Sequence, residues 1–153
     1  MKLIKFLVKA KKKGYASNGE GGERILKNGA KELRFKEGDF EYVDTYYGFN
    51  PFIGEEIVFE NGKFIWGMNY FGKVFNKNTF FAKKVYSFLK KSMILFNKEM
   101  PFRGPKNFKE GDFKYTNKTK GNIKKFNGNE IIFYKGKKVY ELNYHGSLIK
   151  SKF

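Results

Sequence analysis

Residues 54–72 read GEEIVFENGKFIWGMNYFG, and residues 128–146 read GNEIIFYKGKKVYELNYHG. The two stretches align without a gap and are identical at nine of nineteen positions. The match extends upstream, where KEGDF occupies both residues 36–40 and residues 109–113. Self-similarity at a nearly fixed spacing predicts that one chain contains two similar structural units. We therefore expect an internally duplicated domain with pseudo-two-fold symmetry.

Each repeat contains a sequence that is typical of a β-hairpin. Asn61-Gly62 lies between two alternating apolar runs, which indicates a type I′ turn because both turn residues need a positive φ. Lys135-Gly136 takes the same place in the second copy. A two-residue turn fixes the register of the strands, so we expect Glu130 to face Glu141. The face that carries Ile57 is assigned to the core.

Two further segments, residues 2–12 and residues 79–96, have the apolar spacing of amphipathic helices. For the first of them a strand is the alternative. We expect an α+β fold with a single domain over residues 1–153. One helix-plus-antiparallel-sheet half would span residues 1–75 and the other residues 76–153. A mainly-β sandwich or barrel is the alternative fold.

Composition narrows the class of protein. The chain has no cysteine, which excludes disulfides and thiolate metal ligands. No apolar stretch approaches eighteen residues, and lysines interrupt the apolar run at the N-terminus, which argues against a signal peptide. We therefore expect a cytoplasmic protein that has no membrane contact and no cofactor. The oligomeric state is left open.

The formal net charge of +17 makes nucleic acid a candidate partner, because clustered positive charge releases counterions from phosphates. Of the basic residues only Arg24, Arg34 and Arg103 are arginines, and arginine is the residue that best makes bidentate contacts with phosphates and bases. Any binding of nucleic acid is therefore expected to be non-specific.

Positions that both copies share supply the first candidate site residues. Glu56 and Glu130 are equivalent, and they would either face a ligand cation, act in acid–base chemistry, or lie solvated beside lysines. Tyr70 and Tyr144 are also equivalent. Both tyrosines are expected to point to the core face, where each hydroxyl needs a ligand or a backbone carbonyl as partner.

Positions that differ between the copies supply the other candidates. Trp66 and Tyr140 are the aromatic residues expected to line a pocket. His145 is the only histidine, and it is either a base, a ligand contact or a structural residue. Arg103 lies in a stiff loop between Pro101 and Pro105, where it would clamp a carboxylate or phosphate or form a salt bridge. Without a second histidine we expect no metal site.

Seven short segments, in order along nearly the whole chain, carry a resemblance to a known family. They are FLVKA at residues 6–10, GYA at 14–16, EGDF at 37–40, GEEIV at 54–58, WGMNY at 66–70, PFRGP at 101–105 and YELNYHG at 140–146. They resemble a family of unknown function from bacteria and archaea, whose members occur alone or behind a helix-turn-helix module of the XRE repressor type. The resemblance implies no established reaction. It suggests a domain that senses a small molecule or mediates dimerisation.

We expect a small-molecule-binding or sensory domain related to the C-terminal domains of transcriptional regulators. Its pocket would lie between the halves, with Glu56 or Glu130 at the floor. The expected ligand-binding residues are Glu56, Trp66, Tyr70, Arg103, Glu130, Tyr140, Tyr144 and His145. The alternatives are a nucleic-acid-associated basic protein and an enzyme that uses carboxylate acid–base chemistry. The enzyme is less favoured, and no catalytic residue is identified.

Overall fold

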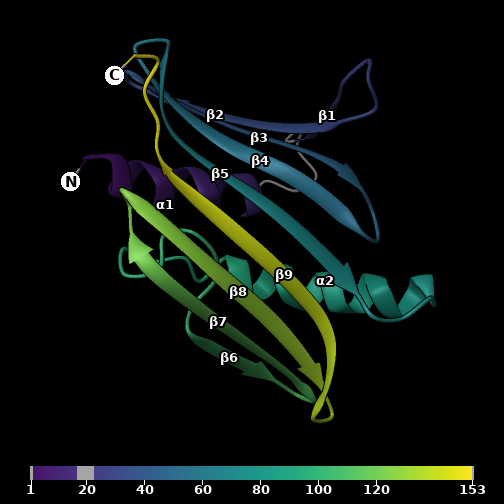
Figure 1. The fold of residues 1–153 in the computed structure, drawn as a ribbon. Coiled ribbons are helices and arrows are strands. Elements are labelled where there is room, and N and C mark those ends of the chain that lie inside the picture. The colour runs from purple at the N-terminus through teal and green to yellow at the C-terminus, as the bar shows by residue number, and fades with distance from the viewer. Residues whose placement is uncertain (1, 17–22, 153) are drawn as a thin grey trace.

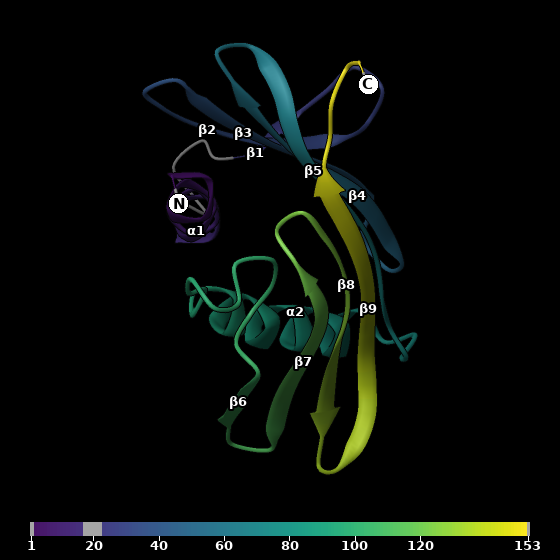
Figure 2. The same ribbon diagram turned by 60° about the vertical axis from the view of Figure 1, so that its left-hand side comes forward.

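The computed structural model describes residues 2–16 and 23–152, and most of this chain is β-structure. Its elements are α1 (Lys2–Ala16), β1 (Glu23–Ile25), β2 (Lys31–Glu37), β3 (Phe40–Gly48), β4 (Phe52–Glu60), β5 (Lys63–Val74), α2 (Thr79–Met93), β6 (Asn107–Glu110), β7 (Phe113–Asn122), β8 (Lys125–Tyr134) and β9 (Lys137–Leu148). The described strands form one antiparallel sheet in the order β1-β2-β3-β4-β5-β9-β8-β7-β6. The sheet is twisted and curved, and both helices lie on its concave side (Figures 1 and 2).

The predicted α+β fold with two helix-plus-sheet halves is wrong. The last strand of the first repeat, β5, pairs along most of its length with the last strand of the second, β9. A free strand edge exposes unpaired backbone groups, and here each repeat satisfies the edge of the other. The fold is mainly β, as the alternative predicted, but the strands form one open sheet rather than a sandwich or barrel.

Strand order and register are symmetric about the pair of central strands. Tyr70 of β5 pairs with Tyr144 of β9, and these tyrosines hold the same position in the two repeats. Outward from this pair the order is β4, β3, β2 on one side and β8, β7, β6 on the other. Corresponding side chains of the repeats are therefore placed at corresponding distances from the centre of the sheet.

Both predicted type I′ turns are present. Asn61 and Gly62 have φ angles of 50° and 76°, and Lys135 and Gly136 have φ angles of 49° and 77°. Each hairpin also contains a β-bulge that the sequence did not predict. The register shifts by one residue after Val58 in the first hairpin, and at the equivalent place in the second.

The bulges reverse the predicted faces of the strands before the turns. Glu130 pairs with Leu142 rather than with Glu141. A slip of one residue moves every side chain of a strand to the other face. Glu56 and Glu130 are therefore fully buried, whereas Ile57, which was assigned to the core, is only half-buried.

The two predicted helices are present, with different ends. The first continues to Ala16, and the second ends at Met93 rather than at Phe96. Asn78 caps α2, because its side chain accepts a hydrogen bond from the backbone N–H of Phe81. Neither of these helices has the length and apolarity needed to cross a membrane.

Equivalent aromatic contacts fasten the helices to the concave face. Phe6 of α1 stacks on Phe40 with ring centroids 5.1 Å apart, and Phe88 of α2 stacks on Phe113 with centroids 4.9 Å apart. Phe40 and Phe113 are the same residue of the KEGDF repeat. The core lies between the helices and the sheet.

Candidate functional site

A cluster of buried ionisable side chains lies beneath the centre of the sheet. Its members are Lys11, Asp44, Glu56, Arg103 and Glu130, each no more than 2% exposed. Lys11 comes from α1, Arg103 comes from the segment after α2, and the acids come from β3, β4 and β8. Charged groups are seldom buried unless they are paired, so the contacts within the cluster determine what it can do.

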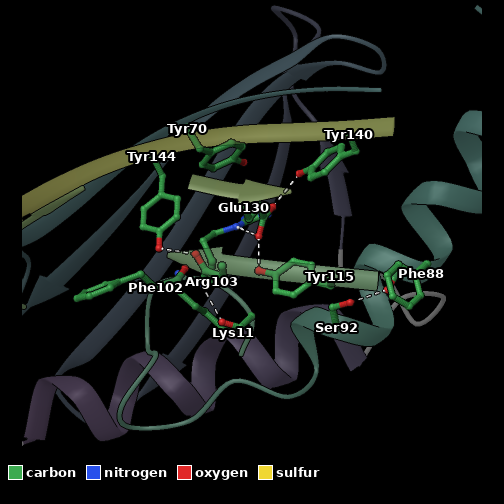
Figure 3. A network of polar contacts seen from close by, with 12 residues as sticks. Lys11, Tyr70, Phe88, Ser92, Phe102, Arg103, Tyr115, Glu130, Tyr140 and Tyr144 are labelled. Atoms are coloured by element: carbon green, nitrogen blue, oxygen red, sulfur yellow. Dashed lines mark hydrogen bonds and ion pairs between the residues drawn. The ribbon is translucent and has the colours of Figure 1, made fainter. Parts of the chain in front are cut away.

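Glu130 is held by three residues that point toward it (Figure 3). Arg103 donates from Nη2 to Oε1 over 2.6 Å and from Nε to Oε2 over 3.2 Å. The hydroxyls of Tyr115 and Tyr140 donate over 2.5 and 2.7 Å. A carboxylate with a bidentate arginine and two further donors is well satisfied, so this part of the cluster is structural.

Tyr115 and Tyr140 stay neutral donors throughout the physiological pH range. Burial, followed by the negative charge of Glu130, holds the pKa of each phenol well above its usual value. Tyr140 is fully buried, although the sequence predicted that it would line a pocket.

Glu56 has a different partner from its repeat equivalent. Nζ of Lys11 lies 2.6 Å from Oε2 of Glu56, and both side chains are fully buried. Lys11 also donates to the carbonyl of Phe102 over 2.5 Å. Burial lowers the pKa of Lys11, and the neighbouring Glu56 charge opposes that shift. The pair joins α1 to β4 and to the segment that carries Arg103.

Tyr70 and Tyr144 point to the core face, as predicted, but their partners are side chains. The hydroxyl of Tyr70 donates to Oδ1 of Asp44 over 2.6 Å, and that of Tyr144 donates to Oδ1 of Asn117 over 2.8 Å. Asp44 and Asn117 are equivalent residues of the upstream repeat. The two halves therefore contain the same contact, with an acid in one and an amide in the other.

Asp44 is the titratable group with the most informative shift. Burial, and then the negative charge of Glu56, raise its pKa from an ordinary value of 3.8 to about 7. The hydrogen bond from Tyr70 and the charges of Lys11 and Arg103 oppose this rise. Asp44 therefore exchanges a proton near neutral pH. This is unusual for an aspartate, and it results from the buried surroundings of the carboxyl.

A pocket of about 240 Å³ opens beside Asp44 on the concave side. Asp44, Tyr70 and Arg103 form its buried floor. The guanidinium carbon of Arg103 lies 5.6 Å from the ring centroid of Tyr70. The walls are mainly apolar and aromatic, and include Leu33, Tyr46, Phe49, Phe52, Tyr86 and Leu89. Apolar walls with a few converging polar groups are typical of small-molecule sites.

The rim of this pocket carries charges of both signs. Lys31 and Lys90 lie there with Glu23. Tyr46, in the wall, donates a hydrogen bond to Glu23, and Nζ of Lys31 lies 5.7 Å from the Tyr46 ring centroid. These two lysines and one glutamate leave a net charge of +1 at the rim, and the polar floor supplies the buried groups that a bound ligand would contact.

The structure brings only some of the predicted site residues to this pocket. Tyr70 and Arg103 line it, whereas Glu56 and Glu130 lie in the ion pairs behind it. Trp66 is fully buried in the core, where its ring stacks on that of Phe126 at 5.7 Å. The remaining predicted residues, Tyr140, Tyr144 and His145, are not among those that line it, and His145 is exposed on the other face of the sheet.

Asp44 was missed by the sequence reasoning. The signal was present, because the aligned repeats carry Asp44 in one copy and Asn117 in the other. A search for residues that both copies share overlooks such a position. Among the described residues no group of three or more His, Asp or Glu side chains is arranged to hold a metal ion.

Residues 44–149 match the family model described as "Domain of unknown function (DUF5680)", and this span is more than two thirds of the chain. The chain belongs to this family. The DUF5680 span contains the whole polar floor of the pocket, Asp44, Tyr70 and Arg103, and it excludes α1. The predicted resemblance to a family of unknown function is thereby confirmed. No curated protein and no solved structure matches the chain.

Proposed function

We propose that the DUF5680 domain binds a small molecule with an aromatic ring and a basic nitrogen in the pocket beside Asp44. The observation that carries this proposal is a buried aspartate, with a pKa of about 7, at the floor of an aromatic-walled pocket. A perturbed pKa in a concave site is a recognised indicator of function.

The charge balance of the buried cluster favours a cationic ligand. Glu56 pairs with Lys11, and Glu130 pairs with Arg103. Asp44 is the third acid in a cluster with two basic groups, so its ionisation leaves one excess negative charge. A protonated amine in the pocket would balance that charge, and an opposite charge nearby favours the ionised form of a carboxyl.

The size and walls of the pocket limit the ligand further. A volume of about 240 Å³ is below the range of about 300–1,000 Å³ that is common for ligand pockets. The ligand would therefore be a compact metabolite with a single ring system. Tyr46 and Tyr86 in the walls would pack on such a ring, and aromatic faces also attract cations.

The family resemblance supports a sensory use of this binding. Members behind helix-turn-helix modules would use the ligand to report the metabolic state to the attached regulator. For this chain the relation to the C-terminal domains of transcriptional regulators and the cytoplasmic location remain predictions.

A thermal-shift series tests the proposal directly. Tyramine, tryptamine and benzamidine serve as probes at pH 6 and pH 8, with 2-phenylethanol as the uncharged control. Because Asp44 ionises near pH 7, at least one amine should stabilise the protein saturably, and more strongly at pH 8. Asp44→Asn should abolish this pH dependence, whereas the same change at the exposed Asp112 should not.

The possible results test the role of Asp44 and the class of ligand separately. Stabilisation by an amine that survives Asp44→Asn, or equal stabilisation at both pH values, would contradict the assignment of Asp44. No saturable effect from any probe would contradict the class of ligand.

The same carboxyl favours acid–base catalysis as a second function. A general acid or base works best when its pKa is close to the operating pH, and the pKa of Asp44 is about 7. In that case a bound amine would be converted to product, and Asp44→Asn would stop this turnover. Incubation of each stabilising probe with the protein, followed by mass spectrometry, distinguishes binding from catalysis.

A further inference from the structure

The convex face of the sheet lies opposite both helices (Figure 2). Along the central strands the side chains alternate, so that Asn69, Phe71, Asn143 and His145 are exposed while Tyr70 and Tyr144 between them are buried. None of the described helices covers this face at its centre. The exposed side chains therefore form a continuous surface across the approximate axis between the repeats.

The strand register arranges these side chains in rows across the sheet. One row reads Tyr47, Ile53, Phe71, Asn143, Asn129 and Lys118, from β3 to β7. Tyr47, Ile53 and Phe71 are 44%, 56% and 47% exposed, which is unusual for three large apolar side chains side by side. The row therefore changes from apolar, through amide, to basic.

The adjacent row has the same composition at its basic end. It reads Glu55, Asn69, His145, Asn127 and Lys120. Two adjoining grooves follow these rows, and both are lined by Asn69, Lys120, Asn127 and His145. Lys125 lines one of the grooves and Lys118 the other. The amides and the histidine thus lie in these grooves. On one side of them is an apolar platform, formed by Tyr47, Ile53 and Phe71, and on the other is a group of lysines, formed by Lys118, Lys120 and Lys125.

The charges on this face are separated in space. Lys118, Lys120 and Lys125 are exposed at the end formed by β7 and β8. Glu141, on β9, is occupied by an ion pair with Lys138 and a hydrogen bond from Asn129. Glu55 is exposed, but it lies at the opposite end of its row. The end formed by β7 and β8 is therefore positively charged.

We propose that this convex face binds single-stranded nucleic acid. Unpaired bases would stack on Phe71 and Tyr47, the asparagine amides would bond to base edges, and Lys118 and Lys120 would contact phosphates. Open sheets that present aromatic side chains beside basic ones recognise single strands in this way. Phe71 and Lys118 are three strands apart, which is about 14 Å at the usual strand spacing and fits about two nucleotides.

The convex face places its groups in a way that the net charge alone does not describe. A net charge of +17 predicts weak binding of any polyanion anywhere on the surface. On the convex face the strand register places the apolar platform, the row of amides and the group of lysines side by side. This arrangement predicts that single-stranded nucleic acid binds at one defined place. A duplex would not expose its base faces to Phe71.

The test measures binding to fluorescein-labelled U12, dT12 and a 12-base-pair duplex by fluorescence anisotropy in 150 mM salt. The double change Lys118→Ala/Lys120→Ala should weaken binding of U12 or dT12 about tenfold or more, and it should reduce the salt slope by about 1.4, since each phosphate contact on a single strand contributes about 0.7. The control Lys83→Ala/Lys84→Ala removes the same charge from the exposed side of α2. It should change binding less than threefold.

Two phenylalanine variants, one on the convex face and one on α2, test the stacking of bases. Phe71→Ala should weaken binding of the single strands about 5- to 30-fold, in the range expected for loss of one stacked base. Phe80→Ala, which removes a ring that is 70% exposed on α2, should leave binding unchanged. Circular dichroism checks that each variant is folded. Equal losses in the face and control variants, duplex binding as tight as single-strand binding, or no binding at 150 mM salt would overturn the proposal.

Discussion

The carboxyl group of Asp44 distinguishes the first half of the molecule from the second, which has an amide at the equivalent position. The equivalent residue Asn117 accepts the same tyrosine hydrogen bond but carries no charge. The backbone, the tyrosine and its glycine neighbour are repeated, so the difference in chemistry comes from a single side chain. The pocket with the titratable floor is correspondingly found on the side of Asp44.

Asp44 should make the stability of the protein depend on pH. Its pKa rises from 3.8 to about 7 on folding, so its contribution is fully favourable below pH 4 and is lost as the pH rises toward 7. This loss amounts to about 4 kcal/mol at most, because one pKa unit corresponds to about 1.4 kcal/mol. Asp44→Asn should therefore gain more stability relative to the wild type at pH 8 than at pH 5, as measured by urea unfolding.

Asn117→Asp is the reciprocal variant, because it places a carboxyl in the equivalent environment. It should lose stability as the pH rises from 5 to 8. If the stability difference between Asp44→Asn and the wild type is the same at both pH values, the carboxyl of Asp44 has an ordinary pKa and the argument for its role fails.

At the scale of single residues, the sequence predicted part of the site. Tyr70 and Arg103 were identified from the repeat and from the stiff loop, and both line the pocket. Asp44 was missed because it occupies a position where the copies differ. Whether Glu56 and Glu130 are buried was left open by the sequence, because their burial depends on a bulge, and a bulge changes the face of a strand without changing its composition.

At the level of the elements, the hairpins hold the tyrosines above glycines. A Cβ on Gly54 would lie 2.5 Å from the hydroxyl oxygen of Tyr70, and a Cβ on Gly128 would lie 2.0 Å from Cζ of Tyr144. Each tyrosine thus crosses the neighbouring strand, over its glycine, to reach the strand beyond. A side chain at either glycine would displace the ring from its hydrogen bond.

Gly54→Ala and Gly128→Ala should each destabilise the fold by about 1–3 kcal/mol, the usual cost of overpacking. Gly14→Ala is the control, because a Cβ there meets nothing within 4 Å, and alanine in a helix is favoured over glycine by about 0.5–1 kcal/mol. Urea unfolding compares the three variants. Wild-type stability in both strand variants would show that the tyrosines do not occupy these positions.

The hairpins and helices are the part of the structure that the sequence predicted best. Asn61-Gly62 and Lys135-Gly136 located both hairpins, and apolar spacing located both helices. The bulges could not be predicted, because the extra residues Ile65 and Val139 are β-branched and fit an ordinary strand. The C-terminal end of α2 also differs from prediction, since the helix ends at Met93 rather than at Phe96.

For the whole molecule, the pairing of β5 with β9 determines the architecture. Each repeat has the strands for its own sheet, and nothing in the composition of residues 66–74 or 140–148 shows that their backbone edges meet. The repeat is visible in the sequence as a pattern, but the fold predicted from it is wrong. Gene duplication as the origin of the pattern remains a prediction.

The continuous sheet separates two surfaces of different chemistry. The concave side holds the helices, the buried ion pairs and the pocket beside Asp44. The convex side presents exposed apolar, amide and lysine side chains. The proposed ligand site and the proposed nucleic-acid surface therefore consist of different residues, and variants of one surface should leave binding at the other unchanged.

The most direct test of the central claim is the location of a bound amine by NMR. Chemical-shift changes would be mapped at pH 8 with the probe that stabilises the protein most, or with tryptamine if none does. We predict saturable changes at Leu33, Tyr46, Tyr86 and Leu89, which surround the pocket. Saturable changes centred on Phe71 and His145 of the convex face, or no saturable change at all, would contradict the claim.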